Sequence, residues 1–153
     1  SEYVSLGHLS QADYSDYFTF AAIRNPWDRM LSTYRYLNPA GTPFNEWLAT
    51  TARRRVERGH YFFKPQADYL CDESGQIIVD LVIRLEDFPT AFDEVRQRLG
   101  IPGTGLPHVN MSKQHSELTA DVVYDSETEA LVADLYARDL ELWEYQPPSA
   151  AGN

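Results

Sequence analysis

The sequence predicts an α/β fold in a single domain that spans residues 1–153, with a loose tail from about Pro147. Two apolar runs have the composition of parallel strands covered on both faces, and each is followed by a segment with helical periodicity. Alternation of strands and helices is typical of the α/β class. The 153 residues, 43% of them hydrophobic, suffice for one core. We therefore expect a mostly parallel central sheet flanked by helices.

The first strand and its helix are predicted within residues 17–37. The continuous apolar run 17–23 (YFTFAAI) indicates a buried strand. Asn25 is a suitable N-cap and Pro26 a suitable first helical residue, so a helix is expected to begin there. Ser32 lies away from the middle of its apolar face, toward Asp28 and Tyr36, and is free to make polar contacts. That apolar face comprises Trp27, Met30, Leu31, Tyr34 and Leu37.

The middle of the chain predicts a second helix and a packed loop. Thr42 is expected to cap a helix whose first residue is Pro43 and which Gly59 ends. Residues 60–70 (HYFFKPQADYL) are rich in aromatic side chains and lack a clear period. We expect a packed loop with a short helix after Pro65, followed by a turn.

A second strand and two more helices complete the predicted fold. The run 77–85 (IIVDLVIRL) indicates a strand. Asp87 is expected to cap a helix over about 89–99 that Gly100 ends, with Leu99 on its inner face. A final helix is expected over about 126–136.

Composition and charge restrict the class of partner. The net charge of −10 and the pI near 4.7 argue against a general nucleic-acid or anionic-membrane binder. The basic residues are nevertheless bunched, and such local clusters fit a small anionic ligand. The two groups are Arg24, Arg29 and Arg35, and Arg53, Arg54, Arg55 and Arg58.

Cysteine and histidine content predicts neither a disulfide nor a metal site. Cys71 is the single cysteine, and His108 and His115 lack ligand partners at metal spacing. We find no stretch of eighteen apolar residues and no signal-peptide pattern, so the chain is expected to be cytoplasmic.

Arg24 is the leading candidate for binding an anion. It follows the first strand, and open α/β sheets bind ligands outside the carboxyl ends of their strands. The helix behind it is expected to offer free amides to the anion. These features predict a site for a phosphorylated cofactor. The alternative is an ion pair between Arg24 and a carboxylate such as Asp28.

Several stretches, in order along the chain, resemble the sulfotransferases. The segment 23–37 (IRNPWDRMLSTYRYL) resembles their 3′-phosphate-binding stretch, and 82–101 (VIRLEDFPTAFDEVRQRLGI) a later strand and helix. The similarity is greatest to the type-2 or carbohydrate branch, which includes heparan sulfate 2-O-sulfotransferase. The other matching stretches are Gly7-His8, residues 66–70 (QADYL), 108–113 (HVNMSK) and 135–145 (LYARDLELWEY).

The resemblance implies a donor, a reaction and a set of site residues. The donor would be 3′-phosphoadenosine-5′-phosphosulfate and the acceptor a hydroxyl of a carbohydrate, with no metal ion. Arg24 and Ser32 would bind the 3′-phosphate, and His8 would be the general base. Asn110, Ser112 and Lys113 would lie in a loop over the nucleotide, and His60, Lys64 and Gln66 would border the acceptor groove.

One expected motif is absent from the sequence. Sulfotransferases carry a phosphate loop of the form K-x-G-[GT]-[TS], and no segment of this chain matches it. The fold is therefore expected to be an N-terminally incomplete version of the P-loop-like sulfotransferase fold. A non-catalytic nucleotide-binding or interaction domain is the main alternative. A kinase-like phosphotransferase is disfavoured because the chain lacks G-x-x-x-x-G-K-[ST].

Overall fold

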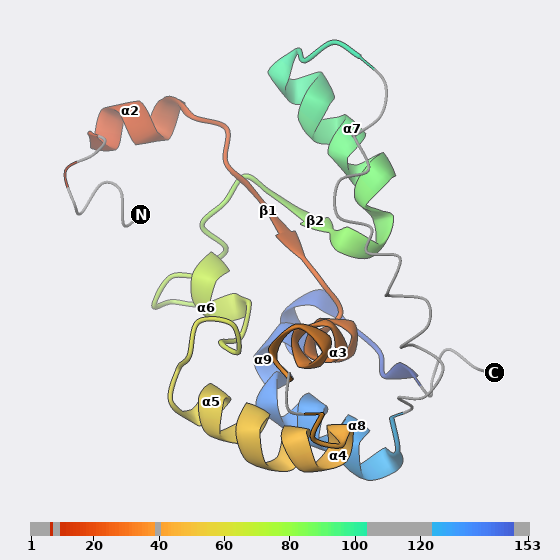
Figure 1. Ribbon diagram of the computed structural model, residues 1–153. Helices are drawn as coiled ribbons and strands as arrows, with labels where there is room; N and C mark the ends of the chain where they lie inside the picture. Colours follow the sequence, from red (N-terminus) through yellow and green to blue (C-terminus); the bar gives the residue numbers. More distant parts are fainter. Residues whose placement is uncertain (1–6, 8–9, 39–40, 104–123, 149–153) are drawn as a thin grey trace.

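The computed structural model describes residues 7, 10–38, 41–103 and 124–148, and it has the predicted α/β character (Figure 1). Within these residues, two short strands alternate with helices. The N-terminal elements are α2 (Gln11–Asp16), β1 (Phe20–Ile23), α3 (Pro26–Leu37), α4 (Phe44–Trp47), a π-helical turn (Leu48–Ala52), α5 (Arg53–Glu57) and α6 (Ala67–Leu70). The C-terminal elements are β2 (Leu81–Arg84), a 3-10 turn (Leu85–Asp87), α7 (Phe88–Leu99), α8 (Ser126–Leu135) and α9 (Ala137–Trp143).

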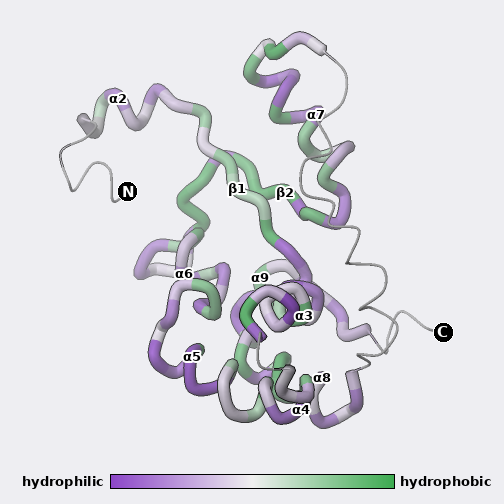
Figure 2. The backbone as a smooth tube through the Cα atoms, viewed as in Figure 1, coloured by the Kyte–Doolittle hydropathy of each residue, from purple (hydrophilic) through white to green (hydrophobic). Residues whose placement is uncertain are grey.

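The two strands are parallel, as the sequence predicts. Phe20 pairs with Leu81 and Ile23 with Arg84, so the carboxyl ends of β1 and β2 lie side by side. The helices α3, α4, α8 and α9 gather beyond the carboxyl end of β1, while α7 packs beside β2 (Figure 1). The strands are the most continuously hydrophobic segments in Figure 2. This arrangement places the residues that follow each strand next to the helical core.

The core confirms the predicted inner face of α3. Trp27 and Met30 are buried, and the other three apolar residues of that face are partly buried against them. Trp47 and Phe63 pack into the same cluster, together with residues of α8 and α9. The cap of α3 is also as predicted, because the Asn25 side chain accepts a hydrogen bond from the Trp27 N–H.

Both strands are shorter than predicted, for a reason visible at their amino ends. The Asp80 carboxylate accepts hydrogen bonds from the N–H (2.7 Å) and the hydroxyl (2.8 Å) of Thr19. The Thr19 carbonyl accepts from the Asp80 and Leu81 N–H groups. These hydrogen bonds between Thr19 and Asp80 come before the regular strand pairing, so the β-ladder begins at Phe20 and Leu81. Ile77 contributes an isolated antiparallel bridge to Cys71 instead.

The Asp80–Thr19 contact predicts acid sensitivity at this end of the sheet. Hydrogen bonds from the backbone and then the hydroxyl of Thr19 hold the pKa of Asp80 below its ordinary value of 3.8. The ionised Asp80 carboxylate therefore stabilises the fold fully above pH 3.8, and this stabilisation is lost as the pH falls through the folded-state pKa. We expect the wild type to exceed Asp80→Asn in urea midpoint at about pH 7, with the difference shrinking toward about pH 3. A difference in urea midpoint that stays constant across this pH range would show that ionisation of Asp80 does not cause it.

Four details of the helices differ from the predictions. The second helix begins at Phe44 with Pro43 as its N-cap, so Thr42 does not cap it, and a π-helical turn interrupts it. Leu99 is 46% exposed rather than inward. The final predicted helix is confirmed as α8, and α9 follows it unpredicted. Over the described residues, no helix is long and apolar enough to cross a membrane.

Candidate functional site

The turn between β1 and α3 is held by hydrogen bonds from distant parts of the chain. The Asn25 N–H donates to Glu86 Oε1 at 2.6 Å, and the Asn25 amide donates to the Gln146 carbonyl at 3.3 Å. Pro26 has no N–H, and the Trp27 N–H donates to Asn25 Oδ1 at 3.0 Å. The expectation of free amides at the start of α3 is therefore wrong for Asn25 and Trp27. An anion bound here must depend mainly on side chains.

Arg24 combines a fixed backbone with a side chain that has no ion-pair partner in the described part of the chain. Its N–H donates to Gln66 Oε1 at 2.8 Å, and its carbonyl accepts from Gln66 Nε2 at 2.9 Å. The ion pairs among the described residues do not include Arg24, so the alternative pairing with Asp28 is not seen. Arg84, at the end of the neighbouring strand, instead donates to the Trp143 carbonyl and lies over the Tyr145 ring. Of these two arginines, Arg24 is the one left for a ligand.

Ser32 lies in the second turn of α3 and is half-buried. Its hydroxyl has no hydrogen-bond partner among the described residues, whereas the neighbouring Thr33 hydroxyl donates to the Arg29 carbonyl at 2.8 Å. Asp28 and Tyr36, on the same side of the helix, are exposed, as the helical spacing predicts. Ser32 is therefore available for a polar contact.

Gln66 is a buried structural residue in this fold. Besides its two bonds to Arg24, its backbone N–H donates to Asp139 Oδ2 at 2.9 Å and its amide Nε2 to the same oxygen at 3.3 Å. The other Asp139 oxygen accepts from the Ala67 N–H at 2.8 Å. Asp139 has no exposed surface, and Gln66 is 9% exposed. Its amide is thus engaged inside the protein, and its predicted acceptor contact stays a prediction.

The aromatic turn 60–64 is attached to α3 through Arg29. One guanidinium nitrogen of Arg29 donates to the carbonyls of Phe62 (3.2 Å) and Lys64 (2.9 Å). The same guanidinium lies 5.7 Å from the centre of the Tyr136 ring. Arg29 therefore has a structural role, and it places the turn beside the helix that carries Ser32.

Exposed rings gather on this turn, where His60 and Lys64 are found. The His60 ring stacks on Tyr61 at 4.9 Å, and Tyr61 contacts Phe62 at 4.5 Å between ring centres. The Phe62 ring in turn contacts Tyr36 of α3 at 5.9 Å. We call these four residues, Tyr36, His60, Tyr61 and Phe62, the aromatic patch. The exposed fractions of its tyrosines are 76% for Tyr36 and 65% for Tyr61, so the patch offers ring surface to a ligand.

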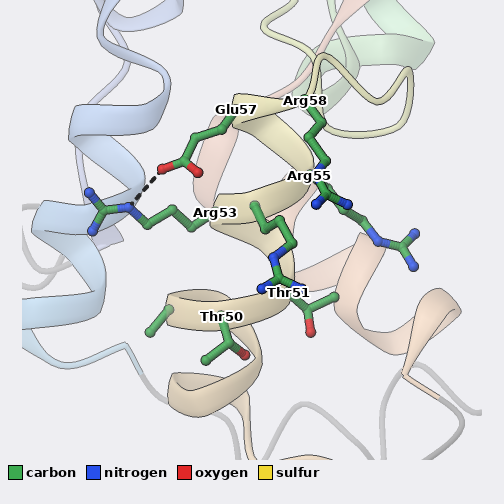
Figure 3. A pocket seen from close by; sticks show the side chains of 8 residues that line it. Thr50, Thr51, Arg53, Arg55, Glu57 and Arg58 are labelled. Atoms are coloured by element: carbon green, nitrogen blue, oxygen red, sulfur yellow. Dashed lines mark hydrogen bonds and ion pairs between the residues drawn. The ribbon is translucent and has the colours of Figure 1, made fainter.

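A basic surface lies along α5 (Figure 3). It adjoins the aromatic patch, because the His60 N–H donates to the Arg55 carbonyl at 2.9 Å. Arg54, Arg55 and Arg58 line an open hollow of about 880 Å³ with Arg53 and Glu57. Arg53 pairs with Glu57 at 3.2 Å, and the Arg55 guanidinium lies 5.4 Å from the centre of the Phe63 ring. The predicted cluster of arginines thus forms one surface, which has more basic than acidic side chains.

The remaining predicted residues cannot be placed. His8, Asn110, Ser112 and Lys113 lie outside the described residues. Within the described ranges, no group of three or more histidine, cysteine or acidic side chains is arranged to hold a metal ion. The structure therefore brings the described candidates together around α3: Arg24 before it, Ser32 on it, and His60, Lys64 and Gln66 beside it.

Comparison with protein families identifies the chain. The model of the sulfotransferase family matches residues 2–146, almost its entire length. The chain belongs to the sulfotransferase family. The described part of this sulfotransferase, helices around a small parallel sheet, is consistent with that fold. Searches of the curated proteins and of the solved structures found no match.

Sequence reasoning missed two residues that shape the site of this sulfotransferase. Asp139 lies at helical spacing from buried Tyr136 and Trp143, so a carboxylate on the apolar face of a helix was the available signal. Glu86 lies in the 82–101 stretch that resembles the family, but no local signal indicates its contact with Asn25, which is 61 residues away. Glu86 also accepts a hydrogen bond from Tyr145. The pKa of Tyr145 is raised, mainly by burial and secondly by the charge of the Glu86 carboxylate.

Proposed function

We propose that the protein transfers a sulfuryl group from 3′-phosphoadenosine-5′-phosphosulfate to a hydroxyl of a carbohydrate. The acceptor hydroxyl loses its proton to His8 while its oxygen attacks the sulfur. The bond between sulfur and the 5′-phosphate oxygen breaks, and 3′-phosphoadenosine-5′-phosphate leaves with that electron pair. Such transfer needs little covalent chemistry from the protein beyond positioning and charge stabilisation.

The observation that carries this proposal is the state of Arg24 in a chain of the sulfotransferase family. Its backbone is fixed by Gln66, while its guanidinium has no ion-pair partner among the described residues. An arginine can hold two phosphate oxygens with its planar fork of donors. We assign the 3′-phosphate to Arg24 and the available hydroxyl of Ser32. Asn110, Ser112 and Lys113 are proposed to cover the nucleotide.

The aromatic patch supports a carbohydrate acceptor. Sugar rings present apolar C–H faces between polar hydroxyl groups, and exposed aromatic rings can pack against such faces. His60 belongs to the patch, and the Lys64 ammonium lies 5.2 Å from the centre of the adjacent Tyr69 ring. We propose that His60 and Lys64 border the acceptor, with Gln66 behind them. The arginines of α5 lie next to this surface and suit an acceptor that carries carboxylates.

Calorimetric titration with 3′-phosphoadenosine-5′-phosphate tests the donor site. We expect binding, and we expect Arg24→Ala to weaken it by about 1.5–3 kcal/mol through loss of a charge-assisted phosphate contact. Arg54→Ala is the matched control, because Arg54 lies on the exposed basic surface of α5 and should leave the affinity unchanged. If only Arg54→Ala loses affinity for the nucleotide, the nucleotide site lies at α5 instead of at Arg24. Absence of binding by the folded wild type at millimolar nucleotide would refute the proposal.

A further inference from the structure

We propose that Gln66 and Asp139 are positioning residues that set the direction of Arg24 toward its anion. This inference rests on the proposed function, because it concerns how the phosphate-binding arginine is held. The three residues come from three different elements, namely the end of β1, the start of α6 and α9. Their contacts run from the buried carboxylate of Asp139 through Gln66 to the proposed phosphate-binding arginine.

The contact between Gln66 and Arg24 fixes a backbone rather than a side chain. One side-chain amide binds both the N–H (2.8 Å) and the carbonyl (2.9 Å) of Arg24, as a neighbouring strand would. Two hydrogen bonds to one residue restrict both its position and its rotation. The Arg24 side chain therefore leaves the end of β1 in a defined direction, and its guanidinium has no ion-pair partner within the described ranges.

Asp139 fixes the orientation of the Gln66 amide. Its Oδ2 accepts from both the backbone N–H (2.9 Å) and Nε2 (3.3 Å) of Gln66. Nε2 therefore faces acceptors on two sides, Asp139 and the Arg24 carbonyl, which leaves Oε1 for the Arg24 N–H. A flipped amide would direct Oε1 at a carboxylate and a carbonyl. Because Asp139 has no exposed surface, water cannot substitute for these bonds.

A free guanidinium on a rigid backbone is what recognition of a phosphate requires. Charge-assisted contacts lose strength when the ligating group is displaced, so binding residues depend on neighbours that lock them. We therefore expect Gln66 and Asp139 to affect phosphate affinity only through the position of Arg24. A residue with a purely structural role would instead change stability without coupling to Arg24.

A double-mutant cycle with 3′-phosphoadenosine-5′-phosphate as the probe tests this coupling. Gln66→Met keeps the length of the side chain and removes its hydrogen bonds. We expect it to weaken nucleotide affinity about tenfold in the wild type and to have almost no effect in the Arg24→Ala background. Gln76→Met is the matched control, since Gln76 is exposed and lies in the 72–76 turn. Circular dichroism confirms that each variant is folded.

The outcomes separate this inference from the proposed function. An unchanged affinity in Gln66→Met, or an equal loss with and without Arg24, would overturn the positioning role while the donor site stands. Absence of nucleotide binding by the wild type would overturn both. If Gln66→Met does not fold, Asp139→Asn replaces it, because it keeps one oxygen acceptor. The same non-additivity with Arg24→Ala is then expected, and full additivity would reject the role.

Discussion

Replacing Asp139 with alanine is expected to destabilise the folded protein by about 3 kcal/mol or more. The carboxylate is completely buried and accepts hydrogen bonds from two backbone N–H groups and one side-chain amide. Alanine would leave these donors buried without an acceptor, which costs about 1–3 kcal/mol for each such group. For a chain of this length, a loss of about 3 kcal/mol lowers the melting temperature by roughly 6–12 °C.

Glu141→Ala is the matched control for Asp139→Ala. Glu141 lies two residues further along α9 and is exposed. Removal of an exposed carboxylate normally changes stability by about 0.5 kcal/mol or less. Urea unfolding of the three proteins gives the comparison directly. Equal midpoints for Asp139→Ala and the wild type would show that the buried bonds contribute little, and would also weaken the case for Asp139 as a positioning residue.

Local signals were enough to predict the elements that carry the candidate donor site. The apolar run before Arg24 predicted β1, and Asn25 followed by Pro26 predicted the start of α3. The inner face of α3 followed from helical spacing alone. These features depend on residues a few positions apart, so the sequence displays them. The expected ends of the strands were wrong because the Asp80–Thr19 contact joins residues 61 positions apart.

The environment of Arg24 could not be predicted for the same reason. Gln66 is 42 residues from Arg24 and 73 from Asp139, and no periodicity links such positions. The resemblance implies that Gln66 borders the acceptor, and the structure adds that its amide binds the backbone of Arg24. Helix α9 was missed although its residues matched a family stretch. Resemblance named the candidate residues, and the structure shows which groups the described candidates contact.

His8→Ala is expected to have the largest effect on catalysis. General-base catalysis contributes about 10²–10⁴-fold, so the maximal rate of sulfuryl transfer should fall by that factor. The affinity for 3′-phosphoadenosine-5′-phosphate should stay unchanged, because the proposed nucleotide ligands Arg24 and Ser32 remain. Transfer is measured as release of this nucleotide with a panel of neutral and uronic-acid-containing oligosaccharides. A fully active variant would exclude His8 as the base.

The pH dependence distinguishes a base from a residue that only binds the acceptor. An imidazole base must be neutral to accept the hydroxyl proton, so wild-type activity should rise through about pH 6.5. This rise in activity with pH should be absent in His8→Ala. His60→Ala is the matched control, because the His60 ring belongs to the aromatic patch. His60→Ala should raise the KM for the acceptor and keep the rise in activity with pH. If His60→Ala loses this rise and His8→Ala keeps it, His60 is the base instead of His8.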